Sequence, residues 1–120
     1  MGNRCVIVDK NTTKENADKK IGIYVHWHGS EQDVKSVLDD AFRKGVRGVD
    51  DDTNYFWARF CQLYANYITA AYADYQKTEY EVGIGIGIVS QLDVNNGDNG
   101  VYYSSNDFEI VKHTDGKELE

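Results

Sequence analysis

The residues best suited to chemistry stand together in the run His26-Trp27-His28-Gly29. A histidine can act as a general base near neutral pH, and Asp98 is a carboxylate that could orient it. Cys61 would be the available nucleophile, but it falls in the middle of a predicted aromatic helix, where access is poor. We therefore assign no catalytic residue and keep a small hydrolase that uses His26 as the third of three hypotheses.

The same run raises the question of a metal site. His26 and His28 share a face if the strand before them persists, and an aspartate or Cys5 could add a ligand. Three oxygen side chains in a later loop look like half of a calcium site: Asp93, Asn95 and Asp98. The position that would need a bidentate acid is Ser104, however. A structural corner and ordinary turn chemistry explain both sets, so we predict no metal and no cofactor.

A polar stripe follows the long helix predicted over residues 54–76. Its members recur at three- and four-residue steps, and only the first is charged: Arg59, Gln62, Asn66, Thr69 and Gln76. A solvated helix face is normally rich in lysine and glutamate. An uncharged polar stripe fits a binding face and fits an internal hydrogen-bond network equally well.

The stripe also supports a small-ligand hypothesis, in which the chain binds a nucleotide or a signalling molecule. Arg59 would meet a phosphate, and Gln62 and Asn66 would contact the polar edges of the base. The base itself would stack on one of three aromatic side chains: Trp27, Trp57 or Tyr102.

A glycine-rich segment, residues 80–89, alternates in period two and predicts a strand. Its isoleucines share one face, and Gly83, Gly85 and Gly87 share the other. The spacing does not fit a dinucleotide fingerprint. We expect the bare face to receive bulky groups from the aromatic helix, with a ligand resting on it as the alternative.

Five predicted strands and two predicted helices must position these residues. Ser30 and Asp33 form an N-cap pattern for a helix that closes at Lys44 and Gly45. Period-two patterns and turn signals predict the strands, at residues 5–8, 21–27, 80–89, 101–104 and 108–112. The order ββααβββ predicts an α+β fold with a mainly antiparallel sheet covered by two helices. Residues 1–120 fit one domain, with a mobile loop near 9–20 and a frayed tail from residue 113.

Charge is distributed unevenly along the chain. The formal net charge is −7, and residues 50–120 hold thirteen of the 20 acidic residues but four of the 13 basic ones. This balance argues against direct nucleic-acid binding and favours a basic partner surface. The carboxylates expected to meet it are Asp50, Asp51, Asp52, Asp74, Glu79 and Glu81. No run approaches the length of about 18 apolar residues that spans a bilayer, and the start lacks a secretory signal, so we expect no membrane contact.

Four segments carry a family resemblance: MGNRCVI, GIYVHWHG, WARFCQ and LDVNNGDNGVY. In this order they resemble a family of small uncharacterised proteins found in phages and prophages of Gram-positive and gut bacteria. The resemblance singles out several residues as structural or binding positions: Asn3, Arg4, Tyr24, His26, Trp27, Gly29, Trp57, Arg59, Gln62, Asp93, Asp98, Asn99, Gly100 and Tyr102.

The resemblance implies a habitat and no reaction. Small proteins of mobile elements often bind and disable a host factor, including CRISPR nucleases, which is an argument by analogy. Our leading hypothesis is therefore a non-enzymatic binding protein in the cytoplasm of a bacterial host. It would inhibit a host protein such as a nucleic-acid-binding antiviral effector, in the manner of an anti-CRISPR protein.

Overall fold

A computed structural model of the chain describes residues 3–71, 83–114 and 119. Within them the predicted order ββααβββ is confirmed. The elements are β1 (Cys5–Asp9), β2 (Ile21–Val25), α1 (Glu31–Arg43), α2 (Thr53–Ala71), β3 (Ile84–Ile88), β4 (Val101–Ser104) and β5 (Ile110–Thr114). Short 3-10 helices follow the first loop (Ala17–Lys19) and β3 (Val89–Gln91).

The five described strands form one sheet in the order β3-β2-β1-β4-β5. The outer pairs and the β1–β2 pair are antiparallel, whereas β1 and β4 run parallel, with Val6 opposite Val101 and Asp9 opposite Ser104. The α+β class and the mainly antiparallel pairing are confirmed, and the one parallel pair, β1–β4, makes the sheet mixed. The parallel pair forms because β4 enters the sheet on the free side of β1 after both helices.

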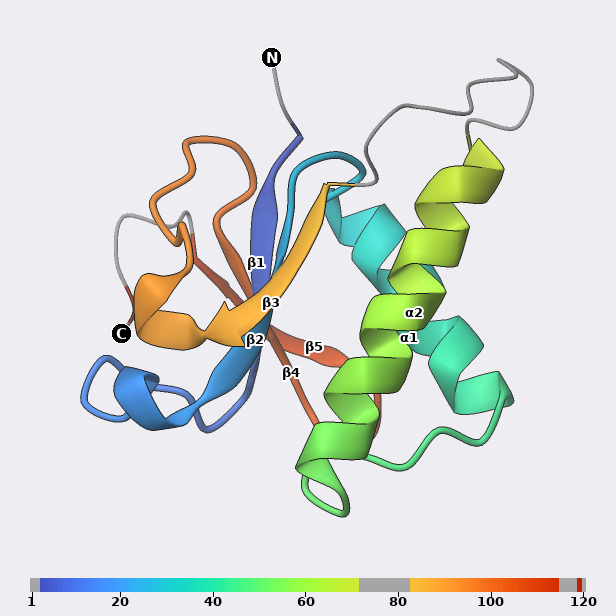
Figure 1. Cartoon of the computed structure of the whole chain (residues 1–120), viewed down its shortest axis with the longest axis horizontal. Coiled ribbons are helices and arrows are strands. Elements are labelled where there is room, and N and C mark those ends of the chain that lie inside the picture. The colour runs from blue at the N-terminus through green and yellow to red at the C-terminus, as the bar shows by residue number, and fades with distance from the viewer. Residues whose placement is uncertain (1–2, 72–82, 115–118, 120) are drawn as a thin grey trace.

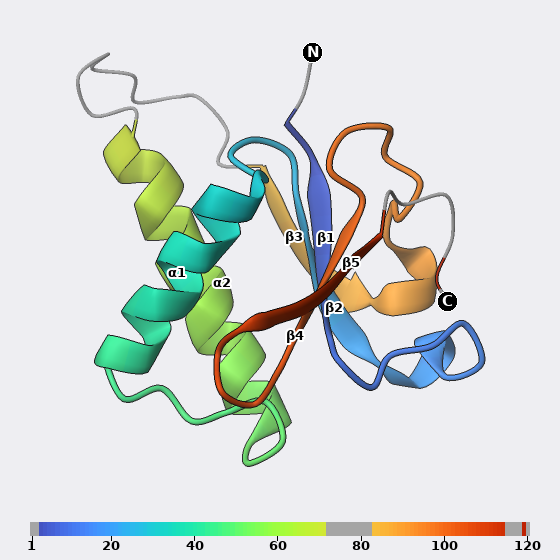
Figure 2. The ribbon, with the colours of Figure 1, turned by 180° about the vertical axis from the view of Figure 1, so that it is seen from behind.

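Both helices lie on one side of the sheet, and the loops over residues 10–20 and 89–100 lie on the other side (Figures 1 and 2). Alternate side chains along each strand point to opposite faces of the sheet. Cys5, Ile7 and Ile23 pack with the helices, whereas Val6 and Val8 pack in a second cluster with residues of the loops. No helix in the described part of the chain combines the length and the apolar character that crossing a bilayer requires.

The first helix begins where its capping sequence predicts. The Ser30 hydroxyl accepts a hydrogen bond from the Asp33 backbone, and the Asp33 carboxylate accepts one from the Ser30 N–H. Four side chains then face the core: Val34, Val37, Leu38 and Ala41. Gly45 follows the helix with a φ of +71°, a conformation that suits glycine at a helix end.

The second helix contributes most of the aromatic core. Its buried side chains are Phe56, Trp57, Phe60, Leu63, Tyr64 and Ile68. The Tyr64 hydroxyl donates to the backbone carbonyl of His28 at 2.6 Å, which ties the helix to the segment between β2 and α1. The helix is described to Ala71, so the last five predicted residues, 72–76, lie outside the described residues.

The expected packing of the glycine strand is wrong. The isoleucines of β3 pair with Ile21, Ile23 and Val25 on the helix side of the sheet. A Cβ added at Gly85 would meet no atom within 4 Å, and one at Gly87 would meet only Leu92, at 3.8 Å. The aromatic rings of α2 therefore do not occupy the bare glycine face, because they lie on the opposite side of the sheet.

Candidate functional site

Asn96 builds the loop that carries Asp98 and Asn99. Its side chain is buried, with Asn96 only 2% exposed. The Asn96 Oδ1 accepts from the backbone N–H groups of Asp98 and Gly100, at 3.0 and 3.1 Å. The Asn96 Nδ2 donates to the carbonyls of Asp93 and Gly100, both at 3.1 Å. One amide side chain thus provides hydrogen-bond partners for backbone groups at both ends of the turn.

This loop is fastened to the start of β1. Arg4 Nε donates to Asp98 Oδ2 at 2.7 Å, and the Arg4 backbone N–H donates to the same oxygen at 3.1 Å. Asn99 Nδ2 donates to Asn3 Oδ1 at 2.6 Å and to the Arg4 carbonyl at 3.1 Å. The structure therefore uses Asp98 and Asn99, predicted as binding residues, to join two distant segments.

The Arg4–Asp98 ion pair should make the stability of the fold depend on pH, which can be tested. The guanidinium lowers the pKa of the Asp98 carboxyl in the folded chain. The stabilisation from this pair is then present above the ordinary pKa of an aspartate and is lost as pH falls through the lowered value. Carbon-detected NMR should show Asp98 titrating below its ordinary value, and Arg4→Gln should raise that value.

The matched control is Lys35→Gln, which removes a cation paired with Glu31 on α1 at 3.0 Å. This variant should leave the pKa of the Asp98 carboxyl unchanged. An unchanged Asp98 titration in Arg4→Gln would contradict the assignment.

His26 takes a partner other than the predicted one. The Tyr24 hydroxyl and His26 Nδ1 lie 2.8 Å apart, and the Trp27 ring meets the imidazole edge to face. Burial is the main cause of the raised pKa of the Tyr24 hydroxyl. Because Asp98 binds Arg4, the predicted dyad of His26 and Asp98 is not formed.

The described residues supply little for nucleophilic or metal chemistry. Cys5 is buried and Cys61 is half-buried, and burial raises the pKa of both thiols, which disfavours the reactive thiolate. Over residues 3–71, 83–114 and 119, no three His, Cys, Asp or Glu side chains group as a metal site.

Two of the three predicted stacking residues cannot receive a base. Trp57 and Tyr102 are each about 1% exposed. The Trp57 ring packs against Phe56 and Phe60, and the Tyr102 ring stacks on His113 with centroids 4.4 Å apart. They are buried because α2 packs on the sheet along much of its circumference and β4 is an inner strand.

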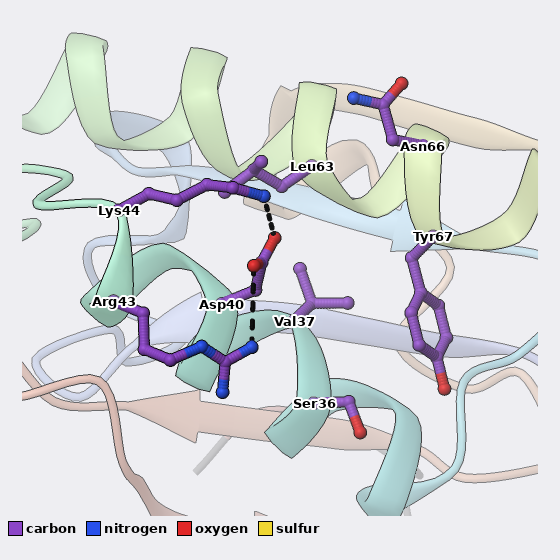
Figure 3. Close-up of a pocket in the computed structure, with 8 residues that line it drawn as sticks. All are labelled: Ser36, Val37, Asp40, Arg43, Lys44, Leu63, Asn66 and Tyr67. Carbon is purple, nitrogen blue, oxygen red and sulfur yellow. Dashed lines mark hydrogen bonds and ion pairs between the residues drawn. The ribbon is translucent and has the colours of Figure 1, made fainter. Parts of the chain in front are cut away.

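The polar stripe of α2 is partly engaged within the helix. Arg59 NH1 donates to Gln62 Oε1 at 3.0 Å, so the cation proposed for a phosphate is already hydrogen-bonded. Gln62 and Asn66 are exposed. Asn66 lines a cavity of about 350 Å³ between the two helices (Figure 3).

Both cations of this cavity pair with the same carboxylate, which leaves one positive charge in excess. Asp40 receives Lys44 Nζ at 2.7 Å and Arg43 NH2 at 3.5 Å (Figure 3). A phosphate bound here would compete with Asp40 for both cations.

The three aspartates of the acidic loop, residues 50–52, differ in their contacts. Asp52 accepts from the Tyr55 N–H at 3.3 Å as the N-cap of α2, and it pairs with Arg47 at 2.9 Å. Asp50 and Asp51 are exposed and extend the acidic surface. The other predicted acids, Asp74, Glu79 and Glu81, lie outside the described residues.

Asn106, in the turn between β4 and β5, fixes the acidic loop from the other end of the chain. Asn106 Oδ1 accepts from the Asp50 N–H at 2.8 Å, and Asn106 Nδ2 donates to Asp51 Oδ2 at 3.4 Å. A Cβ at Gly48 would collide with Asn106, so the turn seats closely on this loop. The contact places the exposed Asp107 beside the acidic loop.

The same turn presents an aromatic ring. Ser105 Oγ accepts from the backbone of Asp107 and Glu109, and Phe108 has a φ of +64°, which is rare for a bulky residue. The Phe108 ring lies between Phe56 in the core and Phe42 on α1, with centroids 5.8 and 6.0 Å away. The turn therefore holds Phe108 at the boundary between core and solvent.

Phe42, whose position continues the apolar spacing of α1, is 67% exposed. The buried stripe of α1 consists of Val34, Val37, Leu38 and Ala41. Phe42 lies at the edge of this stripe, in the last turn of the helix. A second cavity of about 350 Å³ adjoins Phe108, between α1 and β5, and is lined by Lys35, Asp39, Phe108, Glu109, Ile110 and Val111.

Together these residues make a surface of exposed or half-buried apolar groups beside carboxylates. We call it the acidic–aromatic surface and define it as Phe42, Asp50, Asp51, Asp107, Phe108, Glu109 and Val111. The sequence indicated only its acidic loop. No local pattern joins Asn106 to Asp50, because the contact spans 56 positions of sequence.

Comparison of the chain with known protein families, with curated proteins and with solved structures found no match.

Proposed function

We propose that this chain is a non-enzymatic binding protein that uses the acidic–aromatic surface to bind a basic surface of another protein. The observation that carries the proposal is the Asn106 contact, which unites the acidic loop with the Phe108 turn. Protein interfaces commonly combine an aromatic centre with a polar rim, and this surface has both.

The electrostatics favour a basic partner. Asp50, Asp51 and Asp107 are exposed, and Arg47 is already paired with Asp52. Carboxylates at this density steer association with a positive surface and suppress association with nucleic acid itself. A protein that holds nucleic acid in a basic channel presents such a surface.

The resemblance to small phage and prophage proteins gives this proposal its biological setting. We propose that the partner is a host protein in the bacterial cytoplasm, in particular a nucleic-acid-binding antiviral effector of the CRISPR type. The chain would inhibit it by covering the channel that nucleic acid enters. The pairing of Asp98 with Arg4 and the raised pKa values of both cysteine thiols support binding over catalysis.

A retrieval experiment from host lysate tests the proposal. The immobilised chain should retain a nucleic-acid-binding protein, and Asp50→Ala/Asp51→Ala should reduce its recovery about ten-fold, equivalent to about 1.4 kcal/mol. Asp52 is left intact because it caps α2. Phe42→Ala should reduce recovery through loss of apolar contact area.

The matched control is Glu15→Ala/Asp18→Ala, which removes two exposed carboxylates from the first loop and changes the net charge equally. This control should retain the partner as the unaltered chain does. Equal recovery by both double variants would count against the acidic–aromatic surface.

A further inference from the structure

β3 is an edge strand whose outward backbone groups can be identified. His26 N–H donates to the Gly83 carbonyl at 2.8 Å, and Val89 N–H donates to the Lys20 carbonyl at 2.9 Å. Alternate residues of a strand direct their N–H and C=O groups to opposite sides. Gly85 and Gly87 therefore bond to β2, whereas the N–H and C=O groups of the three isoleucines between Gly83 and Val89 point away from the sheet.

The two edge strands of the sheet differ in how well they are protected against pairing with a further strand. β5 is interrupted by a register shift at Tyr103/Ser104 and carries Lys112 and His113, features that discourage further pairing. β3 has a regular register throughout and carries no charge. Its Ile86 and Ile88 are 50% and 42% exposed. An uncharged regular edge with exposed apolar side chains is suited to accept another strand.

We propose that this edge pairs antiparallel with β3 of a second copy of the chain. The strand reads IGIGI in both directions, so a two-fold axis at Ile86 places Ile84 opposite Ile88 of the second copy. In that register every outward N–H and C=O of the three isoleucines gains a partner, and the exposed isoleucines meet one another. The two sheets then become one continuous sheet.

Charge favours a second copy at this edge over other faces. The chain carries a net charge of −7, so two copies repel each other over most of their surface. Residues 83–92, GIGIGIVSQL, contain no ionisable side chain. The sheet order also places β3 at the edge opposite β5, so a dimer leaves the Phe108 turn free.

The contact is short, and its strength follows from its size. Stable interfaces bury about 1,600 Å² in total, which a five-residue ladder with few side chains does not reach. We therefore expect a reversible dimer whose population rises with concentration.

Sedimentation velocity from low micromolar to near millimolar concentration tests the proposal. The unaltered chain should shift from monomer to dimer, and Ile86→Lys should raise the dissociation constant at least about ten-fold, because a charge would enter the paired edge. The matched control is Val111→Lys, since Val111 on β5 is 53% exposed and the charge change is the same. This control should dimerise like the unaltered chain.

Amide hydrogen exchange at low and high concentration gives a second reading on the unaltered chain, which depends on no substitution. The Ile84, Ile86 and Ile88 amides should exchange about ten-fold more slowly at high concentration, whereas the Gly85 and Gly87 amides should not change. A monomer at every concentration, equal dimerisation of Ile86→Lys, or protection confined to other strands would overturn the proposal. A monomeric chain would leave the edge to a strand from a different protein.

Discussion

Replacing Asn96 with alanine should destabilise the fold by about 3 kcal/mol, because four hydrogen bonds of a buried side chain are lost together. Each buried backbone group left without a partner costs about 1–3 kcal/mol, and the loop can rehydrate in part. The loss should also loosen Asp98 and Asn99 from the start of β1. Urea denaturation measures the free energy of unfolding directly.

Asn95→Ala is the control for this prediction, since Asn95 is the exposed neighbour of the same residue type. Its effect should stay within about 0.5 kcal/mol, as for most surface substitutions. Equal effects of the two substitutions would show that the loop is not organised by Asn96.

Phe56→Ala should cost about 3–5 kcal/mol, whereas Phe42→Ala should cost less than about 1 kcal/mol. The Phe56 ring is fully buried and contacts Trp57, Phe60 and Phe108, so its removal leaves a cavity in the aromatic core. The Phe42 ring is mostly in solvent and touches Phe108 on one side.

Thermal and urea denaturation of the two variants provide a matched comparison of phenylalanine substitutions. A loss of stability in Phe42→Ala as large as in Phe56→Ala would place Phe42 in the core and remove it from the acidic–aromatic surface. A small loss leaves Phe42 available for a partner.

Local patterns predicted much of the fold. Period-two alternation indicated the strands, and Ser30 with Asp33 indicated where α1 begins. The parallel pairing of β1 with β4 was not predictable, because local patterns do not report which strands become neighbours. The expectation that aromatic rings cover the β3 glycines failed for a related reason, since periodicity shows that two faces differ but does not show what covers each.

The candidate site was predicted less well than the fold. Asp50 and Asp51 are exposed as expected, but Trp57 and Tyr102 are core residues, since aromatic side chains suit stacking and burial equally. Asp98 and Asn99 appeared available because Arg4 and Asn3, their partners, are more than 90 residues away. Asn106, which assembles the acidic–aromatic surface, belongs to no local sequence pattern, because its partner Asp50 lies 56 positions away.

Phage plating efficiency on a bacterial strain with an active CRISPR system tests the central claim most directly. Strains would express the unaltered chain, Asp50→Ala/Asp51→Ala or the control Glu15→Ala/Asp18→Ala at equal levels. We predict that the unaltered chain and the control restore plating, and that the Asp50/Asp51 variant restores it at least about ten-fold less. Failure of the unaltered chain to restore plating, or equal restoration by both double variants, would contradict the proposed inhibition through the acidic–aromatic surface.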